Sequence, residues 1–189
     1  MSDCASQGAM ASVLTIAGLW NSGPDHWQTF WERERADTQR VQQRDWETPK
    51  REEWVETIRA AVRAAPGPVV LAAHSLACAT VVYFARDAPP AELAKVRGAL
   101  LVAPSDVDGP NYPPVTEGFT PMPLHRLPFK AIVVMSSDDE YVTPERAREF
   151  AEAWGAELVD AGPRGHLNSD SRLGMWPEGQ RLLELLLAG

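Results

Sequence analysis

The chain has 189 residues, a formal net charge of −8 and a pI near 5.0. This length suits one domain, so we expect a single domain over residues 1–189, with a flexible leader at residues 1–11. The acidic balance argues against nucleic acid or an anionic membrane as partner, because both would repel such a surface. Cys4 and Cys78 match no metal-site spacing and form no disulfide framework, which suits a reducing compartment.

The first residues carry no targeting signal that we identify. The apolar run at residues 9–19 lacks the basic region that precedes the core of a signal peptide. No stretch of the sequence is long and apolar enough to span a bilayer. We therefore expect a cytoplasmic protein, either a monomer or a homodimer.

Strands and helices alternate along the whole chain. Apolar, partly β-branched runs predict strands at residues 13–17, 69–74, 98–103, 131–135 and 157–160. Residues 38–43 form a weaker, polar pattern that predicts a strand near an edge of the sheet. Amphipathic patterns and caps predict helices after Pro24, over 51–65, after Ser75, just before residue 98, after Thr143 and over 176–187. This alternation is typical of parallel β-α-β units with right-handed crossovers. It predicts a three-layer α/β/α sandwich.

Ser75 lies at the corner between a buried strand and a helix. A serine at such a corner is what the nucleophile elbow of an α/β-hydrolase requires, since the turn lifts the hydroxyl above the sheet edge. The neighbours two positions away are Ala73 and Ala77 rather than the usual glycines, which weakens the match. An ordinary strand-to-helix junction is the alternative interpretation.

A serine nucleophile needs a histidine base, and four histidines are available: His26, His74, His125 and His166. Only His166 follows the last predicted strand, where the base of an α/β-hydrolase lies. His74 is expected to point away from the site. The alternative for His166 is a loop residue that caps a turn.

The acid of an α/β-hydrolase triad lies between the serine and the histidine in the sequence. Asp138 and Asp139 both follow the penultimate predicted strand, and adjacent residues cannot both face one imidazole. We favour Asp139. Asp138, as a turn-forming residue, and Asp106, at the end of an earlier strand, remain alternatives.

Acyl transfer also needs two backbone N–H groups that stabilise the oxyanion. The residue after the serine and the loop after the first strand normally supply them, which points to Leu76 and Leu19. Alternatively, the loop that carries Leu19 is simply a tight connection between two elements and has no role in catalysis. The long proline-rich loop at residues 104–128 has no periodicity, and loops of this length are usually functional or disordered. We expect a substrate pocket lined by Trp20, Tyr112, Phe119 and Met122.

Five motifs together resemble the small serine hydrolases of the retinoblastoma-binding protein nine/YdeN family, in the α/β-hydrolase superfamily. The motifs cover nearly the whole chain and are GLWNSGPDHW at 18–27, HSL at 74–76, LVAPSDVD at 101–108, SSDD at 136–139 and GHLN at 165–168. The resemblance implies a minimal α/β-hydrolase fold with no cap domain and six strands in the order 2-1-3-4-5-6. It also implies a triad of Ser75, Asp139 and His166 and no cofactor.

These features predict a serine hydrolase that forms an acyl-enzyme on a Ser-His-Asp triad. A small-molecule ester, thioester or amide is the expected substrate, and a carboxylesterase-like activity is the expected class. One alternative is a non-catalytic binding or scaffold protein that retains the fold. Another is a different hydrolytic or C–C cleaving reaction on the same triad.

Overall fold

The computed structural model describes residues 11–189. Residues 1–10, which hold Cys4 and nearly all of the expected leader, lie outside the described residues. The strands are β1 (Ser12–Ile16), β2 (Thr38–Arg40), β3 (Val69–His74), β4 (Val96–Val102), β5 (Lys130–Met135) and β6 (Glu157–Asp160). The helices are α1 (Trp27–Glu34), α2 (Arg51–Ala64), α3 (Leu76–Asp87), α4 (Pro90–Leu93), α5 (Pro144–Trp154) and α6 (Pro177–Leu187), with a 3₁₀ helix at Ser169–Ser171.

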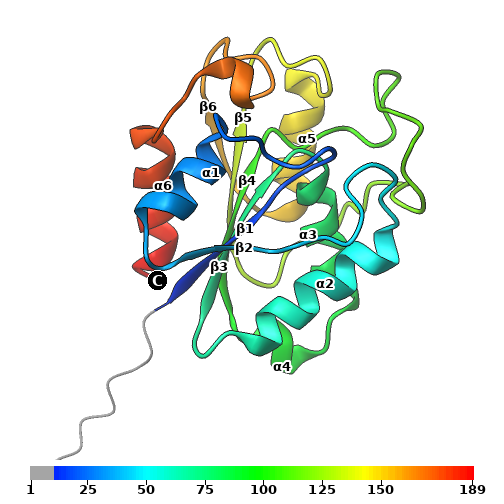
Figure 1. The fold of residues 1–189 in the computed structure, drawn as a ribbon. Coiled ribbons are helices and arrows are strands. Elements are labelled where there is room, and N and C mark those ends of the chain that lie inside the picture. Colours follow the sequence, from blue (N-terminus) through cyan, green and yellow to red (C-terminus); the bar gives the residue numbers. More distant parts are fainter. Residues whose placement is uncertain (1–10) are drawn as a thin grey trace, which may run out of the picture.

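All six strands pair in parallel, in the order β2-β1-β3-β4-β5-β6. Helices α1 and α6 cover one face of this sheet, and α2, α3 and α5 cover the other (Figure 1). The predicted three-layer sandwich and its strand order are confirmed. The loop at residues 104–128 forms no helix and no multi-residue strand, so it inserts no cap domain above the sheet.

The sheet is buried on both faces, which explains why its strands read as continuous apolar runs. Successive residues of β3 contribute to opposite faces: Val70 packs in the core with Trp27 and Trp31, whereas Leu71 packs in the core with Trp54. All five side chains are at most 1% exposed. This two-sided packing fixes the sheet against both helical layers.

Several predicted boundaries differ from the structure, and two of the differences have a clear physical reason. The edge strand β2 ends at Arg40 rather than at residue 43, because only β1 pairs with it and β1 is short. Helix α1 begins at Trp27 instead of near Pro24, since the His26 ring caps it by accepting from the N–H of Gln28. Among the helices of residues 11–189, none combines the length and hydropathy needed to cross a bilayer.

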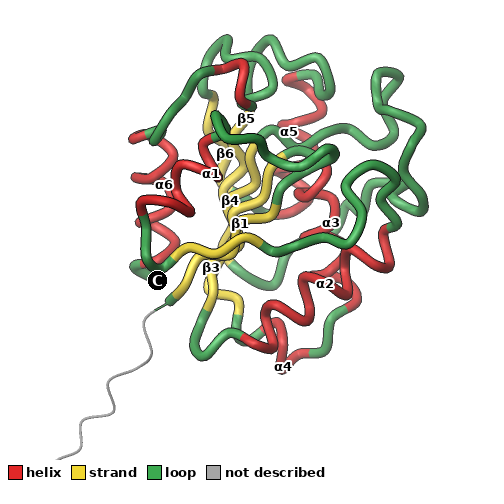
Figure 2. The backbone as a smooth tube through the Cα atoms, in the orientation of Figure 1, coloured by secondary structure: helices red, strands yellow, loops and turns green. Residues whose placement is uncertain are grey.

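Parallel strands place all their carboxyl ends at one edge of the sheet, where ligand sites of α/β proteins lie. Loops gather at that edge above the strands (Figure 2). The segments after β1, β3, β5 and β6 carry Leu19, Ser75, Asp139 and His166 respectively. The topology therefore brings residues scattered along the sequence into one region.

Candidate active site

Ser75 connects β3 to α3 in a strained backbone conformation, with φ 60° and ψ −127°. A non-glycine residue in such a conformation costs about 1–3 kcal/mol, and strain of this kind clusters at functional sites. Ala73 and Ala77 are fully buried at this corner, so their methyl groups fit. Gly18 packs closely against this corner, because a Cβ there would lie 2.7 Å from the Ser75 Cβ and 2.9 Å from the His74 carbonyl oxygen.

Three predicted residues form a hydrogen-bonded chain. Ser75 Oγ lies 2.9 Å from His166 Nε2, and His166 Nδ1 lies 2.9 and 2.8 Å from the two carboxylate oxygens of Asp139. The side chains of His166 and Asp139 are 7% and 0% exposed. A carboxylate can only accept, so Nδ1 donates to Asp139, and Nε2 of the imidazole is then placed to accept from the serine hydroxyl.

The two alternative acids have other partners. Asp138 accepts from Ser136 Oγ at 2.8 Å and from the Gly165 N–H at 2.7 Å, which ties the loop after β5 to the loop of His166. Asp106 accepts two hydrogen bonds, at 2.8 and 3.0 Å, from the guanidinium of Arg146 on α5. The geometry therefore favours Asp139 as the partner of the histidine.

His74 lies in the site, contrary to the expectation that it points away. It is the last residue of β3. Since successive side chains of a strand point to opposite faces, the His74 side chain lies on the same face as that of Ala72, where it is buried beneath α1. Its Nε2 donates to the His166 carbonyl oxygen at 2.8 Å, and burial lowers the pKa of His74 well below its ordinary value. His74 thus supports the backbone at His166.

His26 lies beside His74, with ring centroids 4.7 Å apart. Burial, followed by the positive charge of Arg40 and the proximity of His166, lowers the pKa of His26 to about 3. Its Nε2 is buried and has no hydrogen-bond partner within residues 11–189. Both rings are therefore neutral at physiological pH.

Two candidate oxyanion donors lie beside the same cavity. Leu19 and Leu76 both line the cavity beside Ser75, and in the described part of the chain neither N–H donates to another protein group. Leu76 is the first residue of α3, whose N-terminal N–H groups have no partner within the helix and carry partial positive charge. Such donors suit a developing oxyanion.

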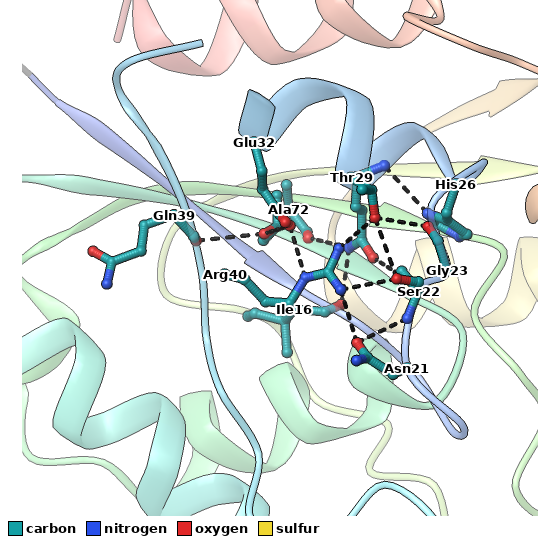
Figure 3. A network of polar contacts seen from close by, with 12 residues as sticks. Ile16, Asn21, Ser22, Gly23, His26, Thr29, Glu32, Gln39, Arg40 and Ala72 are labelled. Carbon is teal, nitrogen blue, oxygen red and sulfur yellow. Dashed lines mark hydrogen bonds and ion pairs between the residues drawn. The ribbon is translucent and has the colours of Figure 1, made fainter. Parts of the chain in front are cut away.

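A polar network fixes the loop that carries Leu19 (Figure 3). The Arg40 guanidinium donates to Asn21 Oδ1 and the Ser22 carbonyl oxygen, each at 2.9 Å, and its Nε donates to Glu32 at 2.9 Å. Gln28, which is fully buried, accepts from Ser22 Oγ at 2.6 Å. The loop is thereby held against α1 and the end of β2.

Gln28 also joins this network to the sheet. Its side-chain amide donates to the carbonyl oxygens of Ile16 and Ala72, at 3.0 and 2.9 Å. These carbonyl groups belong to the end of β1 and to β3, the strands that precede the Leu19 loop and Ser75. One buried side chain therefore links the strands that lead to the candidate oxyanion donor Leu19 and to Ser75.

A cavity of about 210 Å³ opens above Ser75. Its lining includes Leu19, Trp20, Asn21, His26, His74, Ser75, Leu76, Ser105, Tyr112, Pro113, Tyr141, His166, Asn168 and Ser169. Of the residues expected around a substrate pocket, Trp20, which is 53% exposed, and Tyr112 are among those that line this cavity. The cavity therefore combines apolar walls with the polar groups described above.

The prediction that Phe119 and Met122 line this cavity is wrong. They are 1% and 4% exposed and belong to the core under α2 and α3, with the Phe119 ring 6.1 Å from that of Trp54. The hydroxyl of Tyr83 lies 3.1 and 2.6 Å from the carbonyl oxygens of Phe119 and Pro121, and this contact holds the loop against α3. The loop closes the core there, instead of roofing the site.

The site also contains a second serine, Ser105, that was not predicted from the sequence. Ser105 Oγ lies 2.9 Å from Ser75 Oγ, and Ser105 is 3% exposed. Its place directly after a predicted buried strand is the signal that could have found it, since strand ends in parallel sheets carry functional residues. Cys78, by contrast, is a buried core residue, and burial raises the pKa of its thiol.

The family model for serine hydrolases matches residues 13–185. The chain belongs to this serine hydrolase family. The match extends from β1 to α6, so it covers all the residues of the hydrogen-bonded chain and of the loop that carries Leu19. A search of curated proteins finds no match to this serine hydrolase.

Solved structures are similar to the hydrolase over nearly its whole length. A protein from Pectobacterium atrosepticum, described as a YdeN-like hydrolase, is 27% identical with a TM-score of 0.83, covering 95% of this chain and 91% of that one. The ydeN gene product of Bacillus subtilis is 19% identical with a TM-score of 0.74, covering 95% and 100%. The carboxylesterase CesB of Bacillus subtilis is 14% identical with a TM-score of 0.65, covering 96% and 85%. The resemblance to small YdeN-like serine hydrolases is confirmed.

Proposed function

We propose that this protein cleaves a small ester, thioester or amide through an acyl-enzyme on Ser75, with carboxylesterase-like activity. The observation that carries the proposal is the continuous path from Ser75 Oγ through His166 to Asp139, with contacts at 2.8–2.9 Å. Serine is a weak nucleophile until a base removes its proton, and this path supplies the base and its orienting carboxylate.

Acylation begins when a lone pair of Ser75 Oγ forms a bond to the substrate's carbonyl carbon. The Ser75 proton moves to Nε2 of His166, and the π electron pair moves to the carbonyl oxygen. The Leu19 and Leu76 N–H groups are the proposed donors to this oxyanion, and each such donor is worth about 10²- to 10³-fold in kcat. The carbonyl then reforms, the bond to the leaving group breaks, and His166 protonates that group.

Deacylation repeats these steps with water as the nucleophile. Water bonds to the acyl carbon and gives a proton to His166. When the carbonyl reforms, the bond between the acyl carbon and Ser75 Oγ breaks, and His166 returns a proton to Oγ. The net reaction consumes one water and releases an acid and an alcohol, thiol or amine, while Asp139 stays ionised throughout.

The dimensions of the site support a short substrate. The cavity of about 210 Å³ is below the usual range of about 300–1,000 Å³ for sites that hold drug-sized ligands. No cap domain extends it within residues 11–189, and the exposed ring of Trp20 forms part of its lining. Short acyl groups and small leaving groups are therefore the proposed substrates.

The alternative function, a binding protein without efficient chemistry, rests on the idea that Ala73 and Ala77 distort the elbow. Both alanines are fully buried while Ser75 Oγ keeps a 2.9 Å contact with His166. This geometry supports the enzyme. Turnover measurements separate the two functions.

The experiment is a screen of p-nitrophenyl esters from acetate to octanoate, a short thioester and a p-nitroanilide. We expect turnover of the shortest esters, with losses of at least about 10³-fold in Ser75→Ala and His166→Ala. Ser137→Ala, at an exposed serine in the loop after β5, is the matched control and should behave as the unsubstituted protein. Turnover no higher than that of Ser75→Ala on every substrate would instead support the binding protein.

A further inference from the structure

We propose that Ser105 is a further catalytic residue, whose hydroxyl donates a hydrogen bond to Ser75 Oγ and stabilises the negative charge that develops there during acyl transfer. This inference rests on the proposed function. Ser105 lies outside the chain of Ser75, His166 and Asp139. Its starting observation is the 2.9 Å contact between the two serine hydroxyl oxygens.

Ser105 is built into the site. It lies three residues after β4, is buried and lines the same cavity as Ser75. Its segment is fixed on both sides, since the Ala103 N–H donates to the Val134 carbonyl oxygen and the Asp106 N–H donates to that of Tyr141. The ion pair of Asp106 with the Arg146 guanidinium is a further anchor. The hydroxyl is thus held in place and not free to swing into solvent.

Counting protons gives the direction of the hydrogen bond. His166 Nδ1 carries the ring proton because it faces Asp139, so Nε2 is an acceptor and takes the one proton of Ser75. Ser75 then has no proton left for Ser105. Ser105 is therefore the donor in their contact, and within residues 11–189 its Oγ has no other hydrogen-bond partner.

This donor acts when Ser75 Oγ gains negative charge. Of the two lone pairs on Oγ, one accepts from Ser105 and the other is free to form the bond to the carbonyl carbon. As the Ser75 proton moves to His166, the hydrogen bond from Ser105 becomes charge-assisted and strengthens. The same bond stabilises Oγ when it leaves the acyl carbon in deacylation. Ser105 keeps its own proton throughout.

The direct test is the rate at which a fluorophosphonate reacts with Ser75, beside kcat/KM for p-nitrophenyl acetate. Loss of a hydrogen bond to an atom that becomes charged in the transition state slows a reaction by about 10- to 100-fold. We therefore expect Ser105→Ala to lower both the labelling rate and kcat/KM by this factor. The melting temperature should stay close to that of the unsubstituted protein, because the change removes one buried oxygen and leaves no charge unpaired.

A second pair of variants separates the hydroxyl from its shape. Ser105→Thr keeps the hydroxyl, and Ser105→Val has the shape of threonine without it, so both carry the same packing cost. We expect the threonine variant to react at least about tenfold faster than the valine variant. Equal rates for this pair, or a Ser105→Ala variant within about twofold of the unsubstituted protein, would overturn the inference while leaving the proposed function intact. Failure of the unsubstituted protein to react or turn over would overturn both.

Discussion

At the scale of single residues, the site depends on a close approach between two segments. Gly18 lies against Ser75, and its lack of a side chain lets the loop after β1 approach the elbow this closely. Asp139 is shielded completely, so its charge acts on His166 with little screening by water. A methyl group at position 18 and a neutral amide at position 139 should therefore both impair catalysis.

Gly18→Ala should impair catalysis without preventing folding. The added Cβ would lie 2.7 Å from the Ser75 Cβ and 3.2 Å from its Oγ, so one of the two segments must shift. A displacement of about 1 Å in a reacting group can cost about 10²-fold, so we expect kcat/KM to fall by at least about tenfold. Gly23→Ala is the matched control, because its Cβ would meet nothing within 4 Å. Equal activity of the two variants would contradict this role of Gly18.

Asp139→Asn should lower kcat by about 10³- to 10⁴-fold, because an amide no longer holds the imidazole in the required tautomer. Asp138→Asn is the matched control. The amide oxygen there can still accept from the Gly165 N–H and Ser136 Oγ, so we expect activity within about threefold of the unsubstituted protein. Steady-state kinetics on the best ester measure both. If Asp138→Asn has the larger effect, the acid is assigned wrongly.

Much of the hydrogen-bonded chain could be predicted because strand ends are visible in the sequence. Ser75 and His166 each follow an apolar run, and Asp139 follows another. Ser105 also follows an apolar run. Its role could not be predicted, because a long loop without periodicity begins there. The contribution of Gly18 could not be predicted, since it depends on how closely two loops approach in three dimensions.

At the scale of elements, the loop from Gly18 to Pro24 takes its shape from side chains on α1 and β2. Trp20 and Asn21 both have positive φ, at 64° and 65°, an uncommon conformation for such residues. The hydrogen bonds from Arg40 to Asn21 and Ser22 hold this turn in place (Figure 3). An edge strand thereby positions a loop of the candidate active site.

Arg40→Ala should therefore reduce activity, although Arg40 is not among the residues that line the cavity. Without the guanidinium, the loop loses two anchors and the N–H of Leu19 shifts, so we expect kcat to fall by about tenfold or more with a smaller change in KM. Glu32 also loses its ion-pair partner, so the melting temperature should drop.

The matched control for Arg40→Ala is Arg44→Ala, which removes an exposed arginine four residues further along the chain. It should leave kcat unchanged, because Arg44 does not line the cavity and makes none of the hydrogen bonds that hold the Leu19 loop. Steady-state kinetics and thermal melting on both variants measure the two effects. Unchanged kcat in Arg40→Ala would contradict the positioning of this loop by β2.

Most elements could be predicted from their periodicity, but the packing of the long loop could not. Tyr112 lines the cavity while Phe119 lies in the core, although both are aromatic residues of one stretch without periodicity. The Tyr83 hydroxyl, which binds the loop backbone at Phe119, holds that part of the loop against the core. Such a long-range contact leaves no local signal in the sequence.

At the scale of the whole molecule, two buried neutral histidines make stability depend on pH. The pKa of His26 is lowered to about 3 and that of His74 is lowered well below its ordinary value, in each case first by burial. In the unfolded chain both titrate near pH 6.5. Their contribution to stability is therefore complete above that pH and is lost as the pH falls toward the folded-state values.

Between about pH 7 and pH 5, His26 should lower the free energy of unfolding by about 2 kcal/mol, because only the unfolded state takes up its proton. Urea denaturation at both pH values measures this loss. In His26→Asn the amide oxygen can still cap α1 but does not titrate, so the pH-dependent loss should be smaller by about 2 kcal/mol. The same loss in the variant and in the unsubstituted protein would contradict the assignment to His26.

Some expectations from the sequence stay predictions. These are the single domain over residues 1–189, the cytoplasmic location, the absence of a nucleic-acid partner and the choice between monomer and homodimer. The fold class is confirmed by the six-stranded parallel sheet. It could be predicted because alternating strands and helices leave few ways to build a parallel sheet. Within residues 11–189, no group of three or more His, Cys, Asp or Glu side chains is arranged to hold a metal ion.

The most direct test of the central claim is covalent labelling with a fluorophosphonate, read by intact mass and peptide mapping. We predict one adduct, on Ser75, that is lost in Ser75→Ala and strongly slowed in His166→Ala. Ser105→Ala should still be labelled at Ser75, only more slowly. No adduct under conditions that label a known serine hydrolase, or an adduct at another residue, would contradict an activated nucleophile at Ser75.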